Sequence, residues 1–242
     1  MSDLGRRRFV LELLAGAAVV QSALGPLGAA RADAPTVYVF AVLDLRPHVL
    51  EKMLEAEMPG VDVTVFGRVG DFSRALVEAP PDAALALAPV LTTFGLRPEL
   101  QGTLGGSPSE DYLVLSEVEL QASQLGSMPI GCIDLVGRKN LPGFVATVLG
   151  LSSEPEVMRV TKVEDLLQLL QFQRVRAILV GQRFLPELQA RTKMKFNILH
   201  VPSAKVLRMA IAFPGNRRAV EGSLRGLSRA VIERLGVDAW QG

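Results

Sequence analysis

The chain has 242 residues, and its 26 basic and 25 acidic side chains leave a formal net charge of +1 at neutral pH. So balanced a charge supplies no electrostatic reason to bind nucleic acid or an anionic membrane surface. Hydrophobic residues make up 49% of the chain, which is enough for a sizeable core, and the single cysteine, Cys132, excludes an intramolecular disulfide.

The first 32 residues have the pattern of an export signal. Three arginines (6–8) precede an apolar run (9–20), and the small-x-small motif Ala30-Arg31-Ala32 follows. Gly and Pro interrupt the apolar stretch, so it is a poor match to the ~20 apolar residues of a membrane span. We therefore expect cleavage after Ala32 and a periplasmic protein, with a retained anchor as the alternative. The segment GRRRFV also resembles the twin-arginine export signal.

Strands and helices alternate along the rest of the chain. The expected strands are residues 36–43, 61–66, 82–87, 112–118, 130–136, 156–161, 176–181, 196–201 and 206–213. Helices are expected from Pro47, from Phe72, around 144–149, over 165–172, and twice near the end of the chain. Thr161 and Glu164 form a capping-box pattern before the 165–172 helix. Alternation of this kind is typical of an α/β fold with largely parallel sheets.

Two segments of the chain are similar to each other. DFSRALVEAPPDAALALAPVL (71–91) and DLLQLLQFQRVRAILVGQRFL (165–185) align without a gap. In both, a short amphipathic helix leads through a turn into an apolar strand and then into another helix. The shared order of elements is a stronger signal than the few identical residues. We interpret it as one βα unit used twice, once in each of two similar lobes.

These segments resemble the type 2 periplasmic solute-binding proteins, and most closely the phosphate- and phosphonate-binding branch. The resemblance is carried by ALVEAPPDAALALAP, LLQFQRVRAILVG, YLVLSE, IGCIDLVGRKN and VPSAKVLRMAIAFPGN, and spans roughly residues 36–240. It implies two Rossmann-like α/β lobes joined by two crossover strands, with a ligand in the cleft between them. Lobe 1 would then comprise residues 35–116 and 204–242, and lobe 2 residues 117–203.

The ligand-binding residues are expected where the strands end. Ligands of open α/β sheets bind at the carboxyl ends of the strands. This rule predicts contacts from Asp44, Arg68, Ala88 and Pro89 in lobe 1, and from Asp134, Arg138, Gln182 and Arg183 in lobe 2. Each arginine could instead be a solvated surface charge, Asp44 a turn residue and Gln182 a helix-start residue. The internal similarity places Ala88-Pro89 and Gln182-Arg183 at equivalent positions, so these loops should face each other.

The turn DLVGRKN departs from the phosphonate-binding relatives, which place a run of Ser and Thr hydroxyls there. Here the turn holds Asp134 and no hydroxyl. Few aromatic residues in the loops could clamp a sugar. A mostly apolar cleft with a few polar groups would suit a weakly polar ligand.

Catalytic and metal-binding patterns are missing from the sequence. His48 and His200 do not share a metal-ligand spacing, and the chain has no GxSxG, Walker or CxxC motif. Cys132 lies in the middle of an apolar strand, which favours a buried thiol. We therefore expect neither an enzyme nor a bound cofactor.

The expected function is that of an exported solute-binding protein. It would hold a small molecule of unknown identity between its lobes, as a monomer, and deliver it to an inner-membrane ABC transporter. One alternative is a degenerate binding-protein fold that serves as a sensor or assembly partner; another is a carrier of a hydrophobic, lipid-like ligand. A void lined by convergent polar groups would support binding, whereas side chains that fill the cleft would support a degenerate fold.

Overall fold

The computed structural model describes residues 34–43 and 45–242. The predicted export signal and its cleavage point, and the predicted ligand contact Asp44, lie outside the described residues. Within the described part, no helix is long and apolar enough to cross a membrane.

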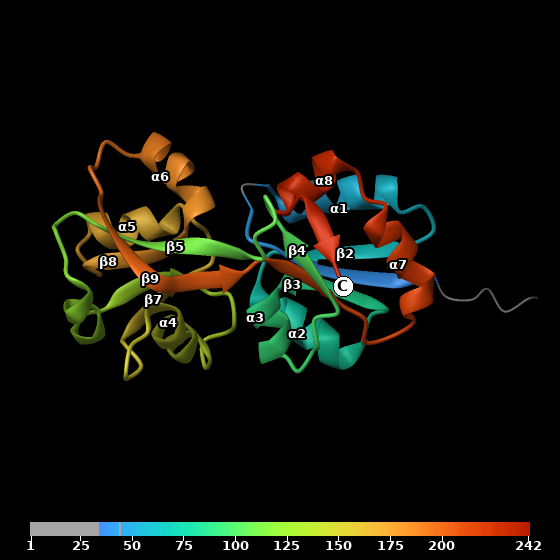
Figure 1. Cartoon of the computed structure of the whole chain (residues 1–242), viewed down its shortest axis with the longest axis horizontal. Coiled ribbons are helices and arrows are strands. Elements are labelled where there is room, and N and C mark those ends of the chain that lie inside the picture. Colours follow the sequence, from blue (N-terminus) through green and yellow to red (C-terminus); the bar gives the residue numbers. More distant parts are fainter. Residues whose placement is uncertain (1–33, 44) are drawn as a thin grey trace, which may run out of the picture. The chain divides into compact units, whose positions relative to one another are not determined.

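The first sheet has six strands in the order β11-β4-β10-β3-β1-β2. They are β1 (Thr36–Phe40), β2 (Asp62–Phe66), β3 (Ala83–Leu87), β4 (Leu100–Thr103), β10 (Met209–Ala212) and β11 (Ala239–Gln241). β1 pairs in parallel with both β2 and β3, and β10 runs antiparallel to β3. Its helices are α1 (Pro47–Glu57), α2 (Val69–Glu78), α3 (Ala88–Thr93), α7 (Arg217–Arg225) and α8 (Arg229–Arg234). Figure 1 shows α1 and α8 on one side of this sheet and α2 and α3 on the other.

The second sheet has five strands in the order β7-β6-β8-β5-β9. They are β5 (Ser109–Ser116), β6 (Ile130–Ile133), β7 (Val157–Val160), β8 (Ala177–Gly181) and β9 (Asn197–Leu207). β6 pairs in parallel with β7 and β8, and β5 runs antiparallel to β8. Its helices are α4 (Leu141–Leu149), α5 (Asp165–Gln171) and α6 (Leu185–Arg191), with 3₁₀ turns η1 (Ala122–Ser127) and η2 (Gln182–Phe184).

The two sheets repeat one arrangement. In each, three parallel strands are joined by helices and continued by an antiparallel strand, in the orders β2-β1-β3-β10 and β7-β6-β8-β5. The ungapped similarity between 71–91 and 165–185 brings β3 into register with β8, residue for residue. Both strands are fully buried, which explains why their sequences are continuously apolar. The predicted α/β class and the repeated unit are therefore confirmed.

The chain passes between the sheets twice, after β4 and at Arg208 between β9 and β10. The sequence predicts two separate strands around Pro202, whereas β9 runs continuously from Asn197 to Leu207. Proline lacks an N–H group and interrupts a central strand, but β9 is an edge strand and tolerates it. β5 and β9 both belong to the second sheet. The bounds of the two lobes themselves stay a prediction.

An aromatic cluster fixes α2 on the first sheet. Phe72, at 0% exposure, stacks on Phe40 of β1 at 5.7 Å between ring centroids. Its ring edge also meets Phe66 of β2 at 5.7 Å and Phe94 at 6.2 Å. Burying such a side chain stabilises the fold by roughly 1.5–3 kcal/mol. The first turn of α2 is therefore held firmly against the ends of β1 and β2.

Candidate functional site: a cavity lined by both sheets

A cavity of about 240 Å³ lies at the carboxyl ends of β1, β2, β6 and β7. It is lined by Phe40, Val42, Gly67, Arg68, Val69, Gly70, Asp71, Arg74, Asp134, Gly137, Arg138, Arg159 and Thr161. Parallel strands of both sheets thus present the loops that follow them to one space. This is the place where open α/β sheets bind their ligands.

The first sheet contributes the turn from β2 into α2. Arg68 precedes the helix in an extended conformation, and its side chain forms no cap on the first turn. The first N–H groups of a helix have no partner within it and carry partial positive charge. Gly70 leaves this part of the wall open, because a Cβ atom built there would meet no heavy atom within 4 Å. This wall of the cavity is therefore electropositive.

The second sheet contributes the loop after β6, which Asp134 organises. Asp134 Oδ1 accepts a hydrogen bond of 2.8 Å from the Gly137 N–H group. Its Oδ2 accepts one of 2.7 Å from Arg159 Nη1 on β7. Gly137 has a φ of 85°, a conformation that glycine adopts without strain. Both carboxylate oxygens are occupied, so Asp134 holds Arg159 and the loop in place and leaves Arg138 beside the cavity.

Positive charge predominates in the cavity wall. The lining contains four arginines and two aspartates, which gives a formal excess of two positive charges. Arg74 lies 3.8 Å from Asp71, and Arg159 pairs with Asp134. Within residues 34–43 and 45–242, neither Arg68 nor Arg138 forms an ion pair. Arg68 lies in the loop after β2 of the first sheet, and Arg138 lies in the loop after β6 of the second.

Three of the predicted contact residues, Arg68, Asp134 and Arg138, line this cavity. Ala88 and Pro89 open α3 instead; Ala88 is buried, and its N–H group donates to the Arg208 carbonyl at 3.0 Å. Gln182 is an exposed residue of η2. The loops after β3 and β8 therefore do not line this cavity, and a ligand contact from them stays a prediction.

Arg183 has a different environment from the cavity arginines. Its Nε lies 3.6 Å from Glu110 Oε2, and its N–H group donates to Glu110 Oε1 at 3.1 Å. Its Nη2 donates to the Val42 carbonyl at 3.3 Å, in the segment after β1. The Glu110 side chain is only 6% exposed. Arg183 thus neutralises a buried carboxylate and connects the second sheet to the first.

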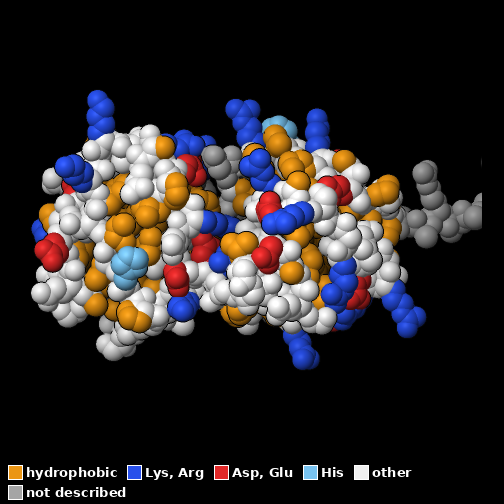
Figure 2. Space-filling model, turned by 45° about the horizontal axis from the view of Figure 1, so that its top comes forward, with side chains coloured by type: hydrophobic (Ala, Val, Ile, Leu, Met, Phe, Trp, Pro, Cys, Tyr) orange, Lys and Arg blue, Asp and Glu red, His pale blue; other side chains and the backbone are white. Residues whose placement is uncertain are grey.

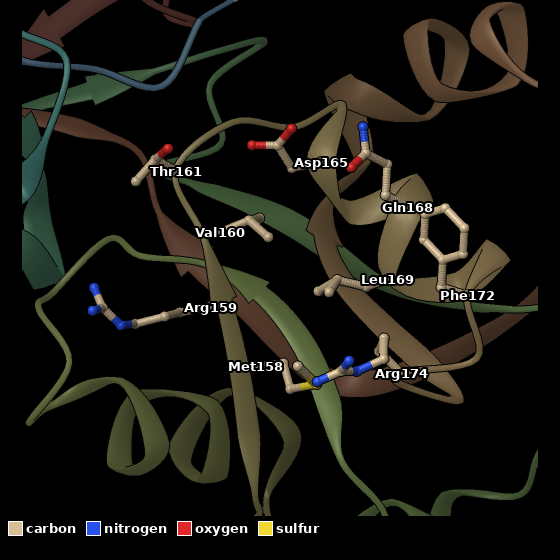
Figure 3. Close-up of a pocket in the computed structure, with 9 residues that line it drawn as sticks. All are labelled: Met158, Arg159, Val160, Thr161, Asp165, Gln168, Leu169, Phe172 and Arg174. Carbon is tan, nitrogen blue, oxygen red and sulfur yellow. The ribbon is translucent and has the colours of Figure 1, made fainter.

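A larger groove, of about 680 Å³, lies between β7 and α5. Figure 3 shows Val160, Leu169 and Phe172 on its walls, with Arg159 pointing away from Leu169 and Phe172. All its lining residues lie between Met158 and Arg174, in β7, α5 and the segments next to them, and none comes from the first sheet. Because a two-lobed protein gains from closure only when the ligand touches both lobes, the smaller cavity is a better candidate site than this groove.

Among the lining residues with polar side chains, the sequence analysis missed Asp71, Arg74, Arg159 and Thr161. Arg74 has the appearance of a solvated helix residue. Arg159 lies between two apolar residues of β7, one residue before the strand ends. A charged residue so close to a strand end was the signal that could have indicated it. Thr161 was predicted to cap the following helix, but α5 begins at Asp165 without a side-chain cap, so the capping box is wrong. Among the described residues, no group of three or more potential metal ligands occurs.

Comparisons with known proteins identify the class of fold. No protein-family model matches the sequence, and no curated protein sequence matches it either. An ATP-bound protein from Xanthomonas citri superimposes with a TM-score of 0.57 at 11% identity, covering 86% of this chain and 90% of that one. A binding-protein component of an ABC phosphonate transporter from Pseudomonas aeruginosa has a TM-score of 0.57 at 10% identity, covering 86% and 82%.

The ligand-binding core of GluR0 in complex with L-glutamate has a TM-score of 0.55 at 12% identity, covering 85% of this chain and 98% of that one. Identities this low show the fold alone. The chain has the two-lobed type 2 periplasmic binding protein fold, and the resemblance predicted from sequence is confirmed at that level. The phosphonate-binding branch is among the similar structures.

Proposed function

We propose that the protein is a solute-binding protein that holds a small molecule in the cavity between β1–β2 and β6–β7. The observation that carries this proposal is the joint lining: Arg68 comes from the first sheet, and Asp134 and Arg138 come from the second. A ligand there touches elements of both lobes, so its binding energy can favour the closed arrangement. The fold, and its similarity to binding proteins of ABC transporters, support the same conclusion.

The proposal extends to export and delivery. The arginine-led apolar segment and its small-x-small motif support export to the periplasm with cleavage after Ala32. Delivery of the solute to an inner-membrane transporter is supported by the similarity to ABC-transporter binding proteins. We propose that the protein acts as a monomer.

The lining and the volume of the cavity argue against both a degenerate fold and a carrier of a lipid-like ligand. A degenerate fold would fill the space with side chains, whereas four arginines and two aspartates converge on an open volume. A lipid-like ligand would need a mostly apolar lining. At about 240 Å³ the volume is below the ~300–1,000 Å³ typical of sites for drug-sized ligands, so it suits a small solute.

A thermal-shift screen tests the function without assuming a ligand. The full-length protein is screened against amino acids, sugars, organic acids, phosphorylated compounds and lipids. A compound at 100 times its Kd should add roughly 2.7 kcal/mol of stability. Gly70→Trp, which would fill the cavity, should abolish the shift. Gly222→Trp, at an exposed position of α7, is the control, since a Cβ there also meets nothing within 4 Å. Stabilisation that survives Gly70→Trp would reject this site.

A further inference from the structure

We infer that the solute is a small dianion, a phosphoryl or dicarboxylate group that is clamped between Arg68 and Arg138. This inference rests on the proposed function and names the ligand class of the same cavity. The charged residues of the cavity are divided between its two walls. On the first wall, Asp71 offsets Arg74 and leaves Arg68; on the second, Asp134 offsets Arg159 and leaves Arg138.

The division leaves one positive charge in excess on each side of the cavity. A neutral or cationic solute would leave Arg68 and Arg138 without a counter-charge. A dianion offsets one charge on each wall. Guanidinium groups present paired N–H donors that match the oxygens of carboxylates and phosphates. Among the described residues, the N–H groups of Val69 and Gly70 at the start of α2 have no hydrogen-bond partner, and they add donors to the first wall. Thr161 lies in the same lining.

Because each wall carries one excess positive charge, the charge of the ligand should affect how strongly the two lobes close on it. Two like charges on facing walls repel each other, so they oppose closure while the site is empty. A bound dianion replaces this repulsion with attraction on both sides. A monoanion satisfies only one wall, and therefore gains less from closure. Affinity should accordingly rise steeply between one and two negative charges on solutes of similar size.

Titration calorimetry on the full-length protein tests the inference with inorganic phosphate, succinate, acetate, glucose and L-arginine. Phosphate or succinate should bind at least about tenfold more tightly than acetate, and glucose and L-arginine should not bind. Which of the two dianions binds distinguishes a phosphoryl from a dicarboxylate site. Arg68 and Arg138 are both exposed, so salt should screen their attraction for the solute. The affinity should therefore fall as NaCl is raised from 50 to 500 mM, since the Debye length is only about 10 Å at 0.1 M.

Paired variants locate the site. Arg68→Gln and Arg138→Gln should each weaken dianion binding by about tenfold or more, because each removes a charge-assisted hydrogen bond. Arg174→Gln, in the groove between β7 and α5, should leave it unchanged. Dianion binding that both cavity variants leave unchanged would overturn the inference. Binding of glucose or L-arginine that Gly70→Trp abolishes would overturn the dianion class and leave the proposed function standing. No stabilising solute in the thermal-shift screen would reject both.

Discussion

Asp134 and Arg159 form a 2.7 Å ion pair that joins the end of β6 to the neighbouring strand β7. The Asp134 side chain is 7% exposed and that of Arg159 is 48% exposed, so the carboxylate is nearly buried while the guanidinium reaches solvent. The other carboxylate oxygen accepts the Gly137 N–H group. A residue predicted to contact the ligand thus serves to position the wall on which Arg138 stands.

Asp134→Asn should lower the free energy of unfolding by about 1 kcal/mol, because it weakens a charge-assisted bond whose arginine is half exposed. Asp134→Ala should cost more, since the Gly137 N–H group also loses its acceptor. Urea denaturation measures both. Asp111→Asn is the control, because its pair with Lys205 spans 3.9 Å between exposed side chains; it should change stability by less than about 0.5 kcal/mol. Equal effects at positions 134 and 111 would contradict the assigned role.

Arg183→Ala should destabilise the protein by about 3 kcal/mol, because it leaves the Glu110 carboxylate buried without its counter-charge. Adding Glu110→Gln should recover part of this loss, since the buried group is then neutral. Chemical denaturation of both variants gives the comparison. The position of Arg183 outside the cavity predicts unchanged solute affinity in Arg183→Ala. A tenfold loss of affinity would instead support the ligand contact predicted from sequence.

Phe72→Ala should cost about 3–5 kcal/mol of stability, since it empties the centre of the aromatic cluster beneath α2. Phe172→Ala is a matched control because that side chain is 73% exposed; its effect should stay within about 0.5 kcal/mol. Thermal or urea unfolding distinguishes the two. Similar losses for both variants would show that Phe72 does not anchor α2.

Burial raises the pKa of the Cys132 thiol to about 12. The native protein should therefore fail to react with a thiol reagent at pH 8, and should give one equivalent after unfolding. The raised pKa contributes stability that is fully present below the unfolded value of about 8.5 and is lost as the pH rises toward 12. Cys132→Ala should flatten this part of the stability curve. Rapid reaction of the folded protein would show that the thiol is accessible.

The repeated unit could be predicted from sequence because its signal is local. The continuous apolar runs of β3 and β8 and the helices before them are visible in short windows, and the ungapped similarity preserves the strand register. β4 and β11 escaped prediction because their short sequences, LQGT and AWQ, contain no continuous apolar run. Their pairing joins Gln101 to Gln241, which a local pattern cannot indicate.

The candidate site could be predicted only in part. The rule about strand ends depends on topology alone, and it indicated the loops that hold Arg68 and Arg138, two residues that line the cavity. It could not distinguish those loops from the ones after β3 and β8, which hold Ala88 and Arg183. That choice depends on how loops from the two sheets meet in space. For the same reason, the pairing that assigns Asp134 to Arg159 needed the register of β6 with β7.

Amide NMR of glycine-labelled protein tests the central claim most directly, that one solute touches both walls of this cavity. Gly67 and Gly70 report on the first wall and Gly137 on the second. Titration with phosphate, or with the strongest stabilising compound from the screen, should shift all three signals with a single Kd and leave Gly222 unchanged. Shifts confined to one wall, or shifts absent while the compound still stabilises the protein, would contradict the account.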